Sequence, residues 1–181
     1  MKEEELNKLK FPIGTFETPL AISNENIRVW IDQIEAFPVK LVELTSGLSN
    51  EQKNWKYRPN GWSVKQVVHH CADSHINSFV RFKWTLTEDT PLIKAYNEGK
   101  WAELSDGNED DLEDSIMLLI GLHAKWARLL RNLNEEELNR AFIHPEHGER
   151  VSLKGNIGVY AWHCEHHLAH IRQAIAAGGN Y

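Results

Sequence analysis

The chain has 181 residues, of which 41% are hydrophobic and 25% are charged, and its formal net charge is -6 at pH 7. This length and polarity are typical of one soluble globular domain and exclude a mainly disordered chain. No run of 18 apolar residues is present, and the acidic residues 3–5 stand where a signal peptide needs basic and then apolar ones, so we expect neither a membrane span nor export.

The net charge and the cysteine content indicate which partners and which cellular compartment to expect. A pI near 5.9 and the lack of a Lys/Arg cluster argue against nucleic-acid binding. The two cysteines, Cys71 and Cys164, form no CxxC pair and fall within helical patterns, where we expect small core residues. A cytoplasmic location is the simplest interpretation.

The first 22 residues differ from the rest of the chain. They contain Phe11-Pro12-Ile13-Gly14 and Thr18-Pro19, so we expect an extended arm over residues 1–22 and a single domain over residues 23–181. From Ser23 to Leu44, apolar residues recur at three- and four-residue steps, which predicts a first amphipathic helix.

The second helix has the clearest start signal in the sequence. Ser63 can cap it and Gln66 completes a capping box, so we expect the helix to begin at Ser63 and to end before Thr90-Pro91. Residues 87–108 then form a long connection, and connections of that length in compact domains are often functional or cross over a face.

Two further helices follow. The third is predicted to open at Glu109 and to close near Arg131, with acidic and basic ends that match the helix dipole. Between residues 134 and 152 we expect a short acidic helical turn and then a small hairpin over residues 142–151, with His144 and His147 exposed in its turn. The fourth helix is predicted to run from Ser152 to Ala177. The sequence therefore predicts an all-α four-helix bundle with an N-terminal arm, a long loop between helices two and three, and a hairpin before helix four.

Histidine is the unusual feature of the composition, with ten residues in the chain. On the fourth helix, His163, His167 and His170 fall within a sector of about 80° that borders the apolar face, so their rings should point into the bundle. Buried imidazoles need partners, and one divalent cation would satisfy several together. A helix face of hydrogen-bonded or solvated histidines is the alternative, because an i, i+4 pair alone is weak evidence.

A third ligand must come from another helix, since catalytic metal sites usually have three protein ligands and an open position. On the second helix, His70 shares a polar strip with Ser74, Asn77 and Arg81, which is expected either for residues lining a cavity or for a solvent-facing edge. His75 lies in the apolar stripe and is interpreted as a core residue. His123, on the third helix, is interpreted in the same way.

At these residues the sequence resembles the YfiT branch of the DinB-like family of metalloenzymes. The resemblance covers nearly the whole chain, from the arm to the fourth helix. The segments that carry it are Phe11–Gly14, Trp62–Ser78, Arg81–Lys83, Leu86–Glu88, Trp101–Leu104, Tyr160–His163 and His167–Ile171.

The resemblance implies a four-helix bundle that binds one divalent ion through His70, His163 and His167, and it excludes His166. It also implies a metal-dependent hydrolase, and some relatives transfer low-molecular-weight thiols onto small electrophiles. Cys164-Glu165 departs from the residues that lie between the ligands in those relatives, which leaves the polarity of the pocket and the substrate open.

The sequence therefore predicts an enzyme with one divalent metal ion per subunit, zinc or nickel, that activates water or a low-molecular-weight thiol against a small electrophilic substrate. Asn77 and Arg81 are candidates for orienting an anionic substrate, and Asp73 is a candidate for handling a proton. A homodimer is expected from the arm and from exposed aromatic residues such as Trp101. The alternative is a non-catalytic, metal-stabilised structural or sensing bundle.

Overall fold

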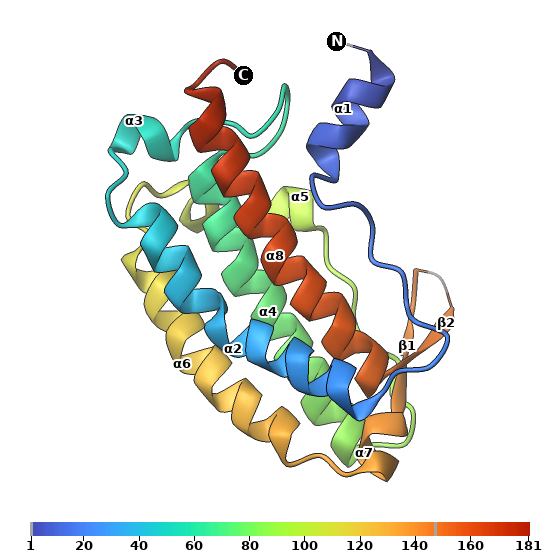
Figure 1. Cartoon of the computed structure of the whole chain (residues 1–181). Helices are drawn as coiled ribbons and strands as arrows, with labels where there is room; N and C mark the ends of the chain where they lie inside the picture. Colours follow the sequence, from blue (N-terminus) through green and yellow to red (C-terminus); the bar gives the residue numbers. More distant parts are fainter. Residues whose placement is uncertain (1, 147) are drawn as a thin grey trace.

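Four long helices form the molecule's core in the computed structural model, which describes residues 2–146 and 148–181 (Figure 1). They are α2 (Asn24–Thr45), α4 (Val64–Thr87), α6 (Glu113–Arg131) and α8 (Leu153–Ala177). Both α2 and α4 pack against α6 and α8, which encloses a single apolar core. The predicted four-helix bundle is thus confirmed. Within the described residues, none of the helices has an apolar stretch long enough to traverse a bilayer.

The direction of the helices explains the long connection. In Figure 1, α2 and α8 run one way and α4 and α6 run the other, so that α4 and α6 are parallel although they are consecutive long helices. The chain must therefore return along the bundle, and it does so with α5 (Glu98–Trp101) and the short 3-10 helix η1 (Asp106–Asn108). Lys65 Nζ lies 2.7 Å from Asp110 Oδ1, which places the end of this crossover beside the start of α4.

The predicted start of the third helix is wrong by four residues. α6 begins at Glu113, whereas Glu109 to Asp111 remain in the crossover. The acidic residues were interpreted as a helix N-terminus, but Asp110 instead pairs with Lys65 and accepts from Asn54 Nδ2 at 3.0 Å. These contacts to α4 and to the segment after α3 (Asn50–Lys53) compete with helix formation at this point.

The elements before α8 follow the prediction closely. After α7 (Glu135–Asn139), strands β1 (Ala141–His144) and β2 (Glu149–Ser152) pair antiparallel, with Ala141 opposite Ser152. His144 was predicted to be exposed in the turn, but it ends β1 and its side chain is only 20% exposed, whereas the predicted exposure of His147 lies outside the described residues. Ser152 caps α8 by accepting from the backbone of Gly155, and the helix ends at Gly178 in the left-handed conformation, with φ 60°.

The arm is not extended throughout, which corrects the prediction for residues 1–22. Residues Glu3–Lys10 form α1, whose acidic first turn and basic last turn match the helix dipole. The prolines restrict only the segment that follows, and residues 11–22 contain no helix. This segment lies along α8, where Trp162 Nε1 donates to the Gly14 carbonyl at 3.1 Å.

Candidate metal centre

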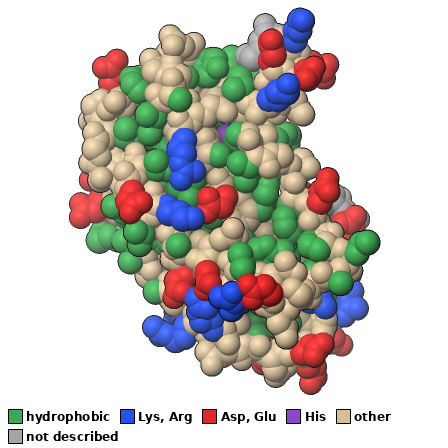
Figure 2. All heavy atoms as spheres, viewed as in Figure 1, with side chains coloured by type: hydrophobic (Ala, Val, Ile, Leu, Met, Phe, Trp, Pro, Cys, Tyr) green, Lys and Arg blue, Asp and Glu red, His purple; other side chains and the backbone are tan. Residues whose placement is uncertain are grey.

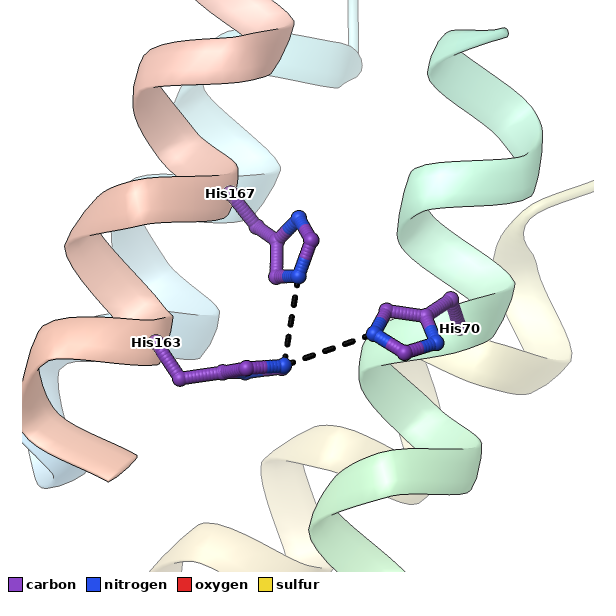
Figure 3. A group of neighbouring side chains, drawn as sticks. All are labelled: His70, His163 and His167. Atoms are coloured by element: carbon purple, nitrogen blue, oxygen red, sulfur yellow. Dashed lines mark hydrogen bonds between the residues drawn. The ribbon is translucent and has the colours of Figure 1, made fainter. Parts of the chain in front are cut away.

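Three imidazoles from two helices meet inside the bundle. His163 and His167 lie one turn apart on α8, and His70 faces them from α4 (Figure 3). His163 Nε2 lies 3.3 Å from His70 Nε2 and 3.2 Å from His167 Nε2. Nitrogens bound to one ion at about 2.0–2.1 Å are roughly 3 to 3.5 Å apart. The spacing therefore fits a shared cation.

Burial keeps these imidazoles uncharged. His70 and His167 are 4% and 6% exposed, and only a small area of histidine reaches the surface on the face shown in Figure 2. Burial lowers the pKa of His70 to about 4, and the charge of His166 adds to this effect. It also holds the pKa of His163 and that of His167 well below the ordinary value. Neutral rings have a lone pair to offer, which metal binding requires.

A chain of hydrogen bonds fixes which nitrogen of His163 carries the proton. The Ile34 carbonyl on α2 can only accept, so His123 donates to it from Nδ1 at 2.5 Å. His123 Nε2 then accepts from His75 Nδ1 at 2.7 Å, and His75 Nε2 accepts from His163 Nδ1 at 3.0 Å. A neutral imidazole has one N–H, so His163 is protonated at Nδ1 and its Nε2 carries a lone pair. We call this chain the core relay.

A second chain does the same for His167. The Lys10 carbonyl, at the end of α1, accepts from His170 Nε2 at 3.0 Å. His170 Nδ1 is therefore an acceptor, and His167 Nδ1 donates to it at 3.4 Å. His167 Nε2 is left with a lone pair directed at His163. We call this chain the arm relay.

Together the two relays test whether the site suits a metal. The lone pairs on Nε2 of His163 and His167 face one another at 3.2 Å, so this contact is not a hydrogen bond. The two Nε2 atoms would instead suit a shared cation, to which each could offer its lone pair. Among the described residues, no relay fixes the tautomer of His70. In the tautomer with its N–H at Nδ1, His70 would supply the third lone pair from Nε2. The donor set of neutral imidazoles suits Zn, Ni, Co or Fe(II).

The group of candidate ligands is limited to these three histidines within the described residues. Among the described residues, His70, His163 and His167 are the only set of three or more His, Cys, Asp or Glu side chains whose ligand atoms come close enough to share an ion. His166, between the ligands on α8, stacks on Trp162 with ring centroids 4.3 Å apart. Three protein ligands are typical of catalytic zinc sites, and four are typical of structural ones.

The polar residues predicted around the site lie farther along α4. Asp73 is half-buried, and burial raises its pKa, with a further contribution from Asp106. Asn77 donates to the backbone carbonyl of Asp73 at 2.8 Å. Arg81 lines a separate cavity. In the part of the chain that the structure describes, none of the three has a hydrogen bond or ion pair to the three imidazoles.

Sequence reasoning did not find the function of the relay residues. His75 and His123 were interpreted as core residues, and both are fully buried at 0% exposure. Their periodicity shows burial but not which polar atom they face. His170 did share the sector of the two ligands on α8, which was a usable signal. The sequence gives no indication that the Lys10 carbonyl ends the arm relay, because every residue has a backbone carbonyl.

The two cysteines behave as predicted. Cys71 and Cys164 are free thiols at 0% exposure. Burial raises the pKa of each, so both remain protonated near neutral pH. A buried thiol of this kind is inert, and neither cysteine is a candidate nucleophile.

Comparison with known proteins gives concordant matches. The sequence matches the DinB superfamily over residues 33–171. It is 43% identical to "Putative metal-dependent hydrolase YfiT" of Bacillus subtilis over 91% of this chain and 93% of that protein. It is 48% identical to a protein of the same description, OB0782, from Oceanobacillus iheyensis over 90% of this chain and 93% of that one. The solved structure of the Bacillus subtilis YfiT, described as "a probable metal-dependent hydrolase with an unusual four-helix bundle topology", superposes with a TM-score of 0.92 at 42% identity, covering 95% of this chain and 98% of that one.

Proposed function

Because the chain belongs to the DinB superfamily, we propose that it is a metal-dependent enzyme that activates water or a low-molecular-weight thiol against a small electrophilic substrate. His70, His163 and His167 would hold one divalent ion, zinc or nickel, per subunit. The observation that carries the proposal is the convergence of two relay-fixed lone pairs, on His163 and His167, beside His70.

The chemistry follows from the donor set. A divalent cation with three neutral ligands keeps its full charge and lowers the pKa of a coordinated water or thiol toward neutrality. In hydrolysis, the oxygen of water bonds to a carbonyl carbon, and the leaving group departs with a proton. In thiol transfer, sulfur bonds to an electrophilic carbon, the leaving group departs with the bonding electron pair, and the thiol proton goes to a base.

The protein's own residues would hold the metal ligands and the substrate in place and transfer a proton. The core relay holds the ring of His163 and keeps its proton on Nδ1, and Trp62 packs against His70 with centroids 4.6 Å apart. We assign Asp73 to proton transfer, because a carboxyl with a raised pKa accepts and releases a proton more readily near neutral pH. Asn77, one turn farther along α4, is assigned to orienting the substrate.

Removing the metal separates this proposal from the structural or sensing alternative. The test compares protein before and after chelation, measuring thermal stability, turnover of chlorodinitrobenzene with a panel of thiols, and hydrolysis of an activated ester. We expect turnover to disappear and the fold to persist, because a bundle of this size needs no metal to fold. Loss of the fold, with no turnover at any metal content, would support the alternative.

Asp73 has a test of its own. Asp73→Asn should lower turnover while metal content stays at one ion per chain, because Asp73 lies outside the group of three histidines that could share an ion. A variant with less metal, or with unchanged turnover, would remove Asp73 from the mechanism.

We also propose that the protein is a cytoplasmic homodimer. The support is the exposed apolar surface, which includes Trp101 at 38% and Leu104 at 54% exposure. Light scattering should give about twice the chain mass of 20.9 kDa. A value equal to the chain mass would contradict the dimer without affecting the metal site.

A further inference from the structure

A polar cavity of about 340 Å³ lies beside the second half of α4. It is formed by α4, the crossover and the turn of the hairpin, and its lining residues are Arg81, Ala95, Tyr96, Asn97, Glu98, His144 and Glu146. His70 and Arg81 are separated by three helical turns, or roughly 16 Å along α4. The cavity is therefore distinct from the three-histidine centre.

Arg81 is the most unusual residue of this cavity. The residue is only 9% exposed, and its Nη2 donates to the Lys94 carbonyl at 3.3 Å. Its buried Nε has no hydrogen-bond partner, and the guanidinium forms no ion pair with a carboxylate of the described residues. Glu98 lies in the same cavity and its charge acts on Arg81, but among the described residues neither Glu98 nor Glu146 pairs directly with the guanidinium. A ligand carboxylate bonded to Arg81 would therefore stabilise its buried charge. Tyr96 also lines the cavity, and its buried hydroxyl offers another donor.

Two carboxylates line the same cavity. Glu98 and Glu146 contribute negative charge there, so a simple anion would be attracted by Arg81 but repelled by both glutamates. A ligand with an ammonium group close to its carboxylate would satisfy both signs. We propose that this cavity binds an amino-acid-type zwitterion, with its carboxylate on Arg81 and its ammonium toward Glu98 and Glu146.

The claim that the cavity binds part of the enzyme's substrate rests on the proposed function. Arg81 would hold the zwitterionic end of a substrate or thiol long enough to span the roughly 16 Å along α4 between this cavity and the three histidines. Binding in the cavity does not itself require a metal, so the two proposals can fail separately. Serine bound without metal-dependent turnover would keep the cavity and reject the enzyme, whereas turnover without serine binding would do the reverse.

The experiment is a titration of the full-length protein, followed in ¹⁵N–¹H NMR spectra, with four small probes. L-serine carries both charges, 3-hydroxypropionate only the carboxylate, ethanolamine only the ammonium, and ethylene glycol neither. We expect L-serine to shift the signals of residues 95–98 and of the Arg81 side chain. The two singly charged probes should bind about tenfold more weakly or worse, because each loses a charge-assisted contact.

Three variants complete the test. Arg81→Gln should lose serine binding, and Glu98→Gln should reduce the preference for serine over 3-hydroxypropionate without abolishing binding. Arg172→Gln, an exposed change on α8 outside the cavity, should leave binding unchanged. Equal binding of serine and 3-hydroxypropionate, binding that survives Arg81→Gln, or no binding of any probe would overturn the proposal. Glu98→Gln serves as the deciding variant if Arg81→Gln does not fold.

Discussion

The two relays orient the candidate metal ligands His163 and His167 in the same way but end in different parts of the molecule. The core relay ends on Ile34 of α2, which is fully buried, and both of its intermediate histidines are fully buried. The arm relay ends on Lys10, an exposed residue of α1, which buries none of its residues in the bundle. His163 is therefore oriented by the hydrophobic core, and His167 is oriented by a segment at the periphery. The first orientation should be as stable as the fold, and the second should depend on how firmly the arm is docked.

The largest expected effect comes from removing His163, whose Nε2 lies next to Nε2 of both His70 and His167. His163→Ala should abolish stoichiometric zinc or nickel binding, measured by elemental analysis of purified protein and by titration of the metal-free form. His166→Ala is the matched control on the same helix, because His166 lies outside the ligand group. Full metal content in His163→Ala, or its loss in the control, would show that the site is assigned to the wrong residues.

Breaking the core relay should have the next largest effect. His75→Phe leaves His163 Nδ1 and His123 Nε2 without their partner, and loss of such a partner typically weakens metal binding about 10- to 100-fold. The metal-free variant should also lose about 1–3 kcal/mol of unfolding free energy, because buried polar groups are left unsatisfied. Chelator competition and urea unfolding measure the two quantities. Metal affinity unchanged from the wild type would show that the relay has no influence on the ligand.

Acid should destabilise the metal-free protein through the same buried histidines. Burial lowers the pKa of His123 to about 4, against an ordinary value of 6.5. Between these two values the unfolded chain binds a proton that the folded protein does not, so stability falls as the pH drops from 6.5 toward 4. The free energy of unfolding, measured with urea at several pH values in this range, should depend less steeply on pH in His123→Phe than in the wild type. An equal slope would mean that His123 does not contribute.

The smallest effect is expected at the arm. Deleting residues 1–10 removes the Lys10 carbonyl, but water can accept from His170 in its place. We expect metal affinity to fall by less than about tenfold, with the free energy of unfolding nearly unchanged. His170→Phe is the sharper companion variant, because it removes the partner of His167 itself and should weaken binding more than the deletion. A deletion as damaging as His75→Phe would remove the distinction between the relays.

The sequence predicted most of this arrangement, and the exceptions have physical reasons. Helix patterns and the Ser63 cap determined the bundle because they are local properties. The start of α6 was wrong because Asp110 forms tertiary contacts with α4 that no local pattern contains. α1 was missed because the prolines dominated the interpretation of residues 1–22, although the charges of residues 3–10 were themselves a helix signal.

The candidate site was predictable only in part. Helical spacing brought His163 and His167 together but left His70 either lining a cavity or facing solvent, and the assignment of all three as ligands came from the family resemblance. Periodicity placed His75 and His123 in the core without indicating that their nitrogens form a chain. The cavity at Arg81 depends on where the crossover brings Tyr96 and Glu98, and this is a long-range property of the fold.

The most direct test of the metal site is to follow the ring nitrogens of all the histidines in long-range ¹H–¹⁵N NMR spectra while zinc is added to the metal-free protein. His163 and His167 should begin with the proton on Nδ1, and Nε2 of His70, His163 and His167 should shift together and saturate at one zinc per chain. A proton on Nε2 of His163 before zinc is added, or a different set of shifting nitrogens, would contradict the account.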